Sequence, residues 1–316
     1  MPSDLHVWSV PLRTKFRGLT VRDGVLVRGD AGWGEFSPFW DYDEQESLSW
    51  WRAAREAADE GWPAAVRDRI PVNVTVPAVD AQTAHRLVEA SGGCRTAKVK
   101  VAEPGQSLAD EIARLEAVRD ALGPSGAIRI DANAAWDVDT AVARLSALDR
   151  AAGGLEYAEQ PVPSVEDLAA LRRRTHVPIA ADESIRRAED PWAVARGHAA
   201  DVVVLKVQPL GGVRACLELA ESIGLPVVVS SALESSVGLA AGIALAAALP
   251  ELPYACGLAT AQLFTADLVA EPLLPTDGAI AVRRPEPDPE LLTSAAAEPD
   301  LAERWRRRVA AVRARA

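Results

Sequence analysis

Five charged residues and one serine each follow a short apolar segment in the middle of the chain. In sequence order they are Lys100, Asp131, Glu159, Asp182, Lys206 and Ser230, and neighbouring members are 23 to 31 residues apart. An interval of this length accommodates one strand and one helix. Because the carboxyl ends of parallel strands in a barrel meet on one face, we expect the six side chains to converge there.

The three acidic residues of this series carry the side chains that a hard divalent cation prefers. Carboxylates that converge repel one another, and a bound cation removes that cost. Oxygen ligands from three strands, with coordination positions left for water and substrate, suit Mg²⁺ or Mn²⁺. No His or Cys occurs in the series, which argues against zinc. We therefore predict a metal site at Asp131, Glu159 and Asp182.

The lysines on either side of the acids are the predicted catalytic residues. Lys98 and Lys100 are two residues apart on one strand, so their side chains point to the same face. Lys206 follows four strands later, roughly opposite them in a barrel. A lysine whose pKa is lowered by burial and a nearby cation can act as a base near neutral pH.

This arrangement predicts carbon-acid chemistry. A metal that binds a substrate carboxylate can stabilise the enediolate formed when Lys100 or Lys206 removes the adjacent proton. The alternative for the lysines is structural pairing with the acids. Asn133 and Glu183 follow two of the predicted ligands within two residues and are candidates to hold them in place. Capping of the local loops is their alternative role.

The elements that position these residues alternate between strands and helices. Strands are predicted at 96–101, 127–131, 155–159, 179–182, 202–207, 226–230 and 254–257, and helices at 109–122, 138–149, 165–175, 191–197 and 213–223. This alternation indicates a parallel sheet, and seven or eight repeats favour closure into a barrel. Before it, strands at 5–11, 20–28 and 33–36 and a helix at 43–69 predict a small α+β unit. A proline-rich segment and a helix at 301–315 end the chain.

Composition narrows the possible partners and location. Of the 316 residues, 49% are hydrophobic and 25% are charged, as in soluble globular proteins, and the net charge is −11. An acidic chain is repelled by nucleic acid and by anionic membranes, so we expect neither as a partner. The longest apolar run, 237–249, is too short to span a membrane. No signal peptide is evident in the first twelve residues, and three scattered cysteines fit a cytoplasmic protein.

The series of two lysines on one strand, three acids and a further lysine resembles the active site of the enolase superfamily. Three more segments are similar to its o-succinylbenzoate synthase family, namely residues 32–38 (GWGEFSP), 230–238 and 257–260. The resemblance covers nearly the whole chain. It implies an α+β capping domain at 1–75, a (β/α)7β barrel at 76–265, and a C-terminal tail at 266–316 that packs on the capping domain.

The same resemblance implies a reaction and a small-molecule carboxylate substrate. The reaction is the syn dehydration of 2-succinyl-6-hydroxy-2,4-cyclohexadiene-1-carboxylate to o-succinylbenzoate, a step of menaquinone biosynthesis. Lys100 would remove the α proton and then, protonated, assist the departure of hydroxide, while Lys206 would stabilise charge as a cation. Lys98, Ser230 and the backbone of Gly257 would contact the substrate.

Two other functions are possible on the same residues. An N-succinylamino acid racemase or related epimerase needs the same lysines and acids, with both lysines as acid and base. A barrel without catalysis could serve as a scaffold, although clustered carboxylates bring no advantage there. Residues 12–22 are expected as a short loop that, in relatives, closes over the site, with Phe16 and Arg17 as candidate specificity residues. We expect a monomer or a small homo-oligomer.

Overall fold

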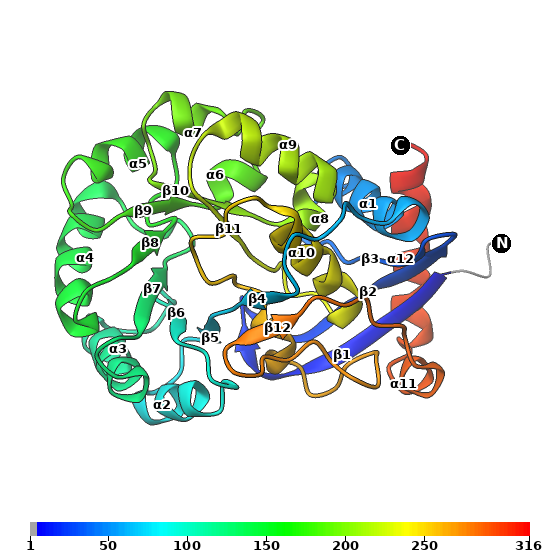
Figure 1. Ribbon diagram of the computed structural model, residues 1–316, viewed down its shortest axis with the longest axis horizontal. Coiled ribbons are helices and arrows are strands. Elements are labelled where there is room, and N and C mark those ends of the chain that lie inside the picture. Colours follow the sequence, from blue (N-terminus) through cyan, green and yellow to red (C-terminus); the bar gives the residue numbers. More distant parts are fainter. Residues whose placement is uncertain (1–4) are drawn as a thin grey trace.

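Seven parallel strands form the centre of the fold in the computed structural model, which describes residues 5–316 (Figure 1). They are β5 (Val74–Val76), β6 (Thr96–Lys100), β7 (Ala127–Asp131), β8 (Tyr157–Glu159), β9 (Ile179–Ala181), β10 (Val202–Leu205) and β11 (Val227–Val229). Each strand is hydrogen-bonded to its neighbours in sequence order. These strands are short runs of buried, mostly aliphatic residues, as is usual for parallel strands that are covered on both faces.

The ring of strands closes through two residues near the end of the repeat. Gly257 pairs in parallel with Ser230, and Cys256 pairs in parallel with Val72. The Gly257 amide donates to the carbonyl of Val229 at 2.8 Å. The segment predicted as a strand at 254–257 therefore contributes two isolated bridges in place of an eighth strand. With this closure the predicted (β/α)7β barrel is confirmed.

Helices cover the outside of the ring (Figure 1). They are α2 (Ala81–Glu89), α3 (Leu108–Leu122), α4 (Val138–Ala152), α5 (Val165–Arg172), α6 (Glu183–Arg186), α7 (Ala193–Arg196), α8 (Val207–Leu210), α9 (Val213–Ile223) and α10 (Ser236–Ala248). The helices α2, α3, α4, α5 and α10 begin after Asp or Ser residues whose side chains accept a hydrogen bond from an amide of the first turn. These caps fix where the strand-to-helix loops before these helices end, and the predicted site residues lie at or just after the strand ends where the loops begin.

The N-terminal unit is an antiparallel sheet with one helix. It contains β1 (Leu5–Phe16), β2 (Leu19–Gly29), β3 (Gly32–Phe36), α1 (Ser47–Arg55) and the π-helical turn η1 (Glu56–Glu60). Two predictions were wrong here. The helix expected at 43–69 ends at Glu60, because Gly61 has φ +71° and Pro63 follows. The loop expected at 12–22 is a β-hairpin with positive φ at Arg17 and Gly18.

The end of the chain returns to this N-terminal unit. After η2 (Ala259–Leu263), β12 (Ala279–Ala281) pairs with β4 (Arg69–Pro71), and α11 (Pro289–Ser294) leads into α12 (Pro299–Arg313). Figure 1 shows α12, in red, beside the blue strands and away from the barrel. Trp305 of α12 is fully buried and lies edge-on against Phe36. The boundaries at residues 75 and 265 stay predictions, and residues 1–4 of the first predicted domain lie outside the described part.

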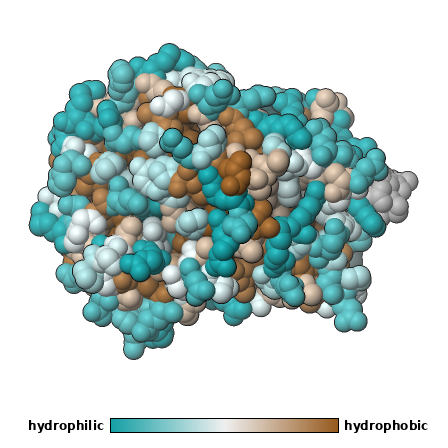
Figure 2. Space-filling view, in the orientation of Figure 1, coloured by the Kyte–Doolittle hydropathy of each residue, from teal (hydrophilic) through white to brown (hydrophobic). Residues whose placement is uncertain are grey.

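The surface and the cysteines give three further observations. Figure 2 shows a mainly hydrophilic face, with hydrophobic residues gathered near its middle, where Figure 1 shows α10. Among residues 5–316, no helix combines the length and the apolar character needed to cross a membrane. Cys94, Cys216 and Cys256 are all buried free thiols.

Candidate active site

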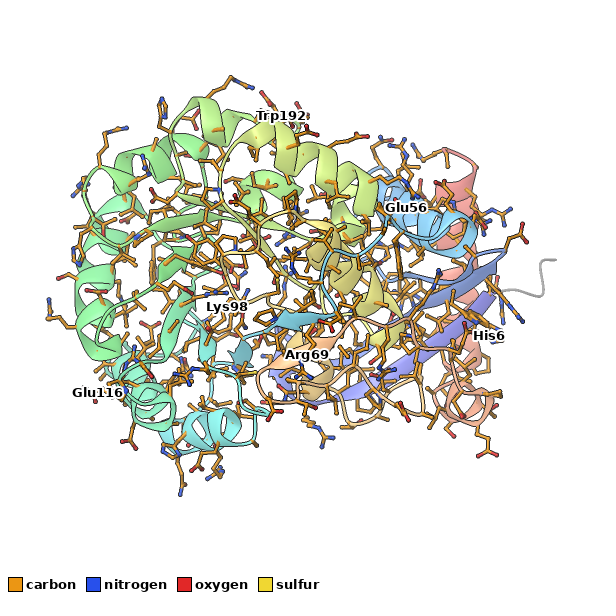
Figure 3. The ribbon with its side chains drawn as sticks, in the orientation of Figure 1. His6, Glu56, Arg69, Lys98, Glu116 and Trp192 are labelled. Carbon is orange, nitrogen blue, oxygen red and sulfur yellow. The ribbon has the colours of Figure 1, made fainter. Side chains whose placement is uncertain are left out.

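The six residues of the predicted series lie around one face of the barrel. Lys100, Asp131 and Glu159 are the last residues of β6, β7 and β8, and they are paired in register across the three strands. Asp182, Lys206 and Ser230 directly follow β9, β10 and β11. The predicted strands at 179–182 and 202–207 were therefore slightly too long, because Asp182 and Lys206 already start the turns into α6 and α8. Lys98 lies inside the ring of strands (Figure 3).

The lysines of β6 each bind a different acid. Lys100 Nζ lies 2.5 Å from Asp131 Oδ2 and 2.6 Å from Asn133 Oδ1. Lys98 Nζ donates to both oxygens of Glu159 at 3.0 Å and lies 3.3 Å from Asp131 Oδ2. All of these ionic side chains are at least 90% buried. Since water is nearly absent, every charge is balanced by a partner at contact distance.

The acid on the other side of the site has two cations. Asp182 Oδ2 accepts a hydrogen bond from Lys206 Nζ at 2.5 Å, and Asp182 Oδ1 accepts one from Arg186 Nε at 3.0 Å. Arg186 also contacts Glu183 and Tyr42 Oη. The sequence interpretation missed Arg186. Its position four residues after Asp182, at the end of the short helix α6, was the available signal.

Burial and the neighbouring charges shift the pKa values of these groups in opposite directions. Burial raises the pKa of Glu159 to about 7, and the nearby Asp131 carboxylate adds to the effect. Burial acts the same way on Asp131 and Asp182, but Lys100 and Lys98 keep the pKa of Asp131 below its usual value, and Arg186 and Lys206 do so for Asp182. Burial lowers the pKa of Lys206, while the carboxylates of Glu159 and Asp131 outweigh burial and raise that of Lys98. The raised pKa keeps Lys98 charged, and at Lys206 the Asp182 carboxylate opposes the effect of burial on the pKa.

The carboxylates do not surround a metal position as they stand. Among residues 5–316, no group of three or more His, Cys, Asp or Glu side chains is arranged to hold a metal ion. The acids instead turn toward the lysines and Arg186. The donor chemistry nevertheless suits a hard cation, because Asp131 and Glu159 are register neighbours and their repulsion raises the Glu159 pKa. Oε2 of Glu183, next to Asp182, is buried and has no hydrogen-bond partner within the described residues.

Asn133 and Glu183 bridge the ends of two strands. The Asn133 amide donates to Asp131 Oδ1 at 3.1 Å, and its side chain accepts from Lys100. Its Nδ2 atom lies 3.3 Å from Glu183 Oε1. Asn133 has φ +47°, a conformation that Asn tolerates better than most residues. Asn133 therefore links Lys100, an acid and the following loop.

Ser230 and Gly257 lie next to each other where the barrel closes. A Cβ atom on Gly257 would lie 2.5 Å from Ser230 Oγ, so only glycine fits there without movement. The sequence interpretation did not single out Ser231, whose hydroxyl donates to Glu234 at 2.5 Å and accepts from Thr260 at 2.7 Å. The serine-rich loop thus has an internal hydrogen-bond network beside the predicted site.

A small cavity joins these residues, and we call it the catalytic cavity. Its volume is about 20 Å³, and its lining includes Lys98, Lys100, Asp131, Lys206, Ser230 and Gly257. Phe16 and Arg17 of the β1–β2 hairpin cover it, and the Phe16 ring lies 5.5 Å from Lys100 Nζ. A second cavity of about 280 Å³, the outer cavity, shares Phe16, Arg17, Lys100 and Asn133 with it. The tip of the hairpin therefore lies between the two cavities, and Lys100 borders both.

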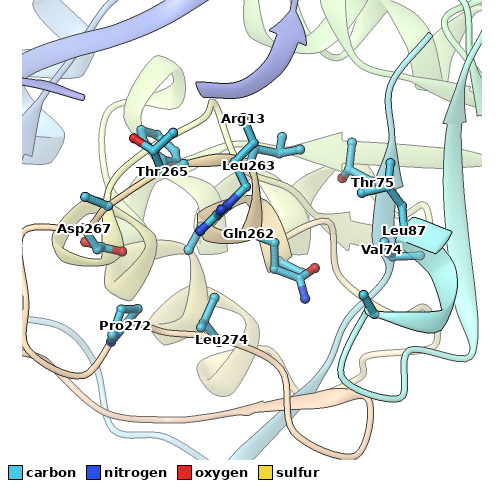
Figure 4. A pocket seen from close by; sticks show the side chains of 15 residues that line it. Arg13, Val74, Thr75, Leu87, Gln262, Leu263, Thr265, Asp267, Pro272 and Leu274 are labelled. Carbon is cyan, nitrogen blue, oxygen red and sulfur yellow. The ribbon is translucent and has the colours of Figure 1, made fainter. Parts of the chain in front are cut away.

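A larger cavity lies elsewhere in the described residues. It measures about 430 Å³ and lies between β1, β5, η2 and the C-terminal tail (Figure 4). Arg13, Leu263 and Gln262 line it, as do Thr75 and Leu274. Thr75 also lines the catalytic cavity, so the two share one wall. None of the predicted lysines or acids faces the larger space, and we assign the chemistry to the catalytic cavity.

Comparison with known families places the two parts of the chain. The family model "Enolase C-terminal domain-like" matches residues 80–287, and "Enolase N-terminal domain-like" matches residues 7–58. A curated protein named o-succinylbenzoate synthase from Thermobifida fusca is 64% identical, over 98% of this chain and 96% of its own length. Proteins of the same name from Mycolicibacterium smegmatis and Mycobacterium tuberculosis H37Rv are each 54% identical, over 98% and 97% of this chain and 95% and 93% of their own lengths.

Solved structures with low sequence identity share the fold. Muconate lactonizing enzyme from Pseudomonas fluorescens superposes with a TM-score of 0.80 at 22% identity, over 93% of this chain and 98% of its own. N-succinyl Arg/Lys racemase from Bacillus cereus gives a TM-score of 0.78 at 20% identity, over 93% and 97% of the two chains. At this identity the likeness concerns the fold alone. The sequence relatives, which match nearly end to end, are more specific, and they show that the chain belongs to the o-succinylbenzoate synthase family of the enolase superfamily.

Proposed function

We propose that this chain dehydrates 2-succinyl-6-hydroxy-2,4-cyclohexadiene-1-carboxylate to o-succinylbenzoate, a step of menaquinone biosynthesis. The identity of 54–64% with curated o-succinylbenzoate synthases, over nearly the full length, carries this proposal. The buried lysines on opposite sides of three acids support it, because they can act on a proton next to a carboxylate. No comparable sequence match favours racemisation.

Lys100 is the proposed base. Its Nζ atom lines the catalytic cavity beside Asn133, on the side that the Phe16 ring covers. After it releases a proton to its surroundings, Lys100 removes the substrate proton α to the carboxylate. It then returns that proton to the departing hydroxyl group, so that water leaves and the ring becomes aromatic. One lysine acting on one face accounts for a syn elimination.

Lys206 and Lys98 are the proposed stabilising cations. Lys206 lies across the cavity and is held by Asp182, so it can place positive charge near the substrate carboxylate without moving a proton. Lys98 is the better fixed cation, since the carboxylates beside it raise its pKa. Ser230 and the backbone at Gly257 are the proposed contacts for the succinyl end of the substrate.

Membership in the superfamily implies a divalent metal, and we propose Mg²⁺ as that metal. Asp131, Glu159 and Asp182 would hold it after their side chains turn from the lysines, with Asn133 and Glu183 as supports. When bound, the cation would supply positive charge beside the substrate carboxylate. The exchange of partners would also release Lys100 from its contact with Asp131.

Ultraviolet detection of o-succinylbenzoate tests the reaction, with and without Mg²⁺, for the native protein and Lys100→Ala. We expect metal-dependent turnover that the substitution lowers by at least about 10³-fold, within the range for loss of a general base. Thermal stabilisation by millimolar Mg²⁺ reports metal binding separately. Stabilisation without turnover would reject this substrate and direct the search to N-acylamino acid racemisation. Absence of both would favour a scaffold.

A further inference from the structure

The side chain of Glu35 extends from the N-terminal unit to the first turn of the barrel helix α10. Glu35 lies on β3, and only 2% of its surface is exposed. Its Oε2 atom accepts hydrogen bonds from the backbone amides of Ser235 and Gly238, both at 3.2 Å, and from the Ser235 hydroxyl. Its Oε1 atom accepts one from Ser37 Oγ at 2.7 Å. An acid from the N-terminal sheet thus binds the first turn of α10.

Side chains accept hydrogen bonds from all four free amides in the first turn of α10. The first four amides of a helix have no partner within the helix. In α10, Glu35 binds two of them, Asp267 of the tail binds Ser236 N, and Ser235 Oγ binds Val237 N. A Cβ atom on Gly238 would lie 2.8 Å from the Glu35 carboxyl carbon. The glycine therefore makes room for an acid from another part of the chain.

The loop before α10 forms one wall of the catalytic cavity. Ser230, Ser231 and Leu233 line that cavity. Glu35 fixes the downstream end of the loop at Ser235, and Arg22 Nε of β2 donates to the Leu233 carbonyl at 3.0 Å. Both contacts come from the N-terminal unit. The position of the serine hydroxyls thus depends on side chains outside the barrel.

Ser37 extends the same arrangement to the neighbouring loop. The Ser37 amide donates to Gln208 Oε1 at 3.1 Å, and Gln208 Nε2 donates to Ser37 Oγ at 3.2 Å. Gln208 is two residues after Lys206, in the short helix α8. Glu35 and Ser37 therefore connect the loops after β10 and β11, and these loops carry Lys206 and Ser230.

We propose that Glu35 is a positioning residue for the reaction, which holds the loop of residues 230–235 in the geometry that binds the succinyl end of the substrate. The inference rests on the proposed function. The charged groups that face the Glu35 carboxylate are Arg22 of β2 and Glu234 of the loop itself. Because its contacts run through backbone amides, removal of its charge should loosen the loop without removing any group that touches substrate.

Glu56 provides a matched control. It also comes from the N-terminal unit and is nearly buried (Figure 3). Its carboxylate accepts from the amides of Val213 and Arg214 at 2.5 and 3.1 Å, in the first turn of α9. Glu56 does not contact the loop of residues 230–235 or line the catalytic cavity. Both acids bind backbone amides in the first turn of a barrel helix. Only the helix bound by Glu35 follows a loop that lines the catalytic cavity.

The test compares Glu35→Gln with Glu56→Gln in the full chain with Mg²⁺. Hydrogen exchange at single amides is measured first, and it needs no activity. We expect about tenfold faster exchange at Ser235 and Gly238 in the first variant, and at Val213 and Arg214 in the second. For dehydration we expect Glu35→Gln to lower kcat/KM by about 10- to 100-fold, mainly through KM, since a displacement of about 1 Å has effects of this size. Glu56→Gln should stay within about twofold.

Three outcomes would decide against parts of this scheme. Equal losses of kcat/KM in both variants would mean that Glu35 only holds the N-terminal unit against the barrel, as Glu56 does. This result would overturn the proposal. Faster exchange at Ser235 with unchanged kcat/KM would overturn it as well. A native protein that binds Mg²⁺ but gives no dehydration would reject the proposed function alone, and the exchange data would still test the anchoring. If Glu35→Gln does not fold, Glu35→Asp keeps the charge but withdraws the carboxylate from these amides, and the same losses are expected.

Discussion

At the scale of single residues, the structure separates the two sides of the catalytic cavity. Lys100 is shared between Asp131 and Asn133, whereas Lys206 is held by Asp182, which also binds Arg186. The second cation beside Asp182 gives that acid a charge balance that does not depend on Lys206 alone. A substitution of Lys206 therefore leaves Asp182 paired, while a substitution of Lys100 leaves an amide and Lys98 near Asp131.

This difference predicts the result of a proton-exchange experiment. In Lys206→Ala, dehydration should fall by about 10²-fold, because a stabilising charge is lost, while exchange of the substrate α proton through Lys100 continues. In Lys100→Ala both should be lost. Mass spectrometry of a substrate analogue in ²H₂O, one that lacks the leaving hydroxyl, measures the exchange. Loss of exchange in both variants would indicate that both lysines transfer protons, as in a racemase.

Glu35 predicts a pH dependence of stability. Burial raises its pKa to about 7 from an ordinary value of 4.5. The stabilisation linked to the protonated form is complete below pH 4.5 and is lost as the pH rises through 7. The free energy of unfolding of the native protein should therefore fall relative to that of Glu35→Gln by about 2 kcal/mol between pH 5.5 and 8.

Urea unfolding at a series of pH values measures this difference. Other buried acids, including Glu159, titrate in both proteins, so their contributions cancel in the comparison. A constant difference between the two proteins across this pH range would show that Glu35 keeps its ordinary pKa. Glu56→Gln serves again as the control, with a difference that does not follow the raised pKa of Glu35.

At the scale of elements, the sequence best predicted the strands that are buried on both faces. Strands such as β9 and β10 are uninterrupted apolar runs, and the charged residue that follows each run marks the face of the predicted site. Strand β5 was missed, because it has only three residues and Thr75 interrupts it. The hairpin at Arg17 and Gly18 was also missed, although a glycine in a two-residue turn was a usable signal.

Contacts between distant elements could not be predicted in this way. The contacts of Glu35 and Glu56 depend on which helix start lies opposite, and a local pattern does not contain that information. For the same reason, the sequence did not predict which side chains pair with Asp131, Glu159 and Asp182. Burial makes pairing with lysines favourable in the absence of a cation, whereas the sequence only indicated that the charges would be close.

The C-terminal helix gives a prediction at this scale. Trp305 of α12 is fully buried, packs against Phe36 and Trp40, and donates from Nε1 to Asp23 at 2.6 Å. Trp305→Ala removes this packing and should lower the free energy of unfolding by about 3–5 kcal/mol. Trp192, which is 42% exposed, is the control, and its substitution should cost about 1 kcal/mol or less. Circular dichroism in urea measures both; similar losses would mean that α12 contributes little to the N-terminal unit.

At the scale of the whole molecule, the distribution of lysine is informative. The chain contains 34 basic residues, and only Lys15, Lys98, Lys100 and Lys206 among them are lysines. Three of the four line the catalytic cavity, and Lys15 lines the outer cavity. Arginine cannot be deprotonated in proteins, so it serves elsewhere as a permanent cation, while a base has to be lysine. This bias was visible in the sequence and independently marks the site.

The charge of the molecule sets a problem for its proposed substrate. The net charge is −11, and the substrate carries two carboxylates, so the average field repels it. Lys15 and Arg17 of the hairpin lie at the outer cavity, where Glu103 is the acidic residue that faces them. At about 7 Å in water, one such cation attracts a dianion by about 1 kcal/mol, which is a several-fold effect on binding. The local field therefore has the opposite sign to the average field.

These two fields predict opposite effects of salt, and the experiment distinguishes them. If the local cations dominate, kcat/KM of the native protein falls as ionic strength rises from 0.01 to 0.15 M, where the Debye length shrinks from about 30 to 8 Å. Lys15→Gln should lower kcat/KM about threefold at low salt and reduce the salt dependence. Arg307→Gln is the control, because it removes one charge from an exposed side chain of α12 that lines neither the catalytic nor the outer cavity. A rise of kcat/KM with salt in the native protein would mean that net repulsion governs substrate approach and that the hairpin cations do not offset it.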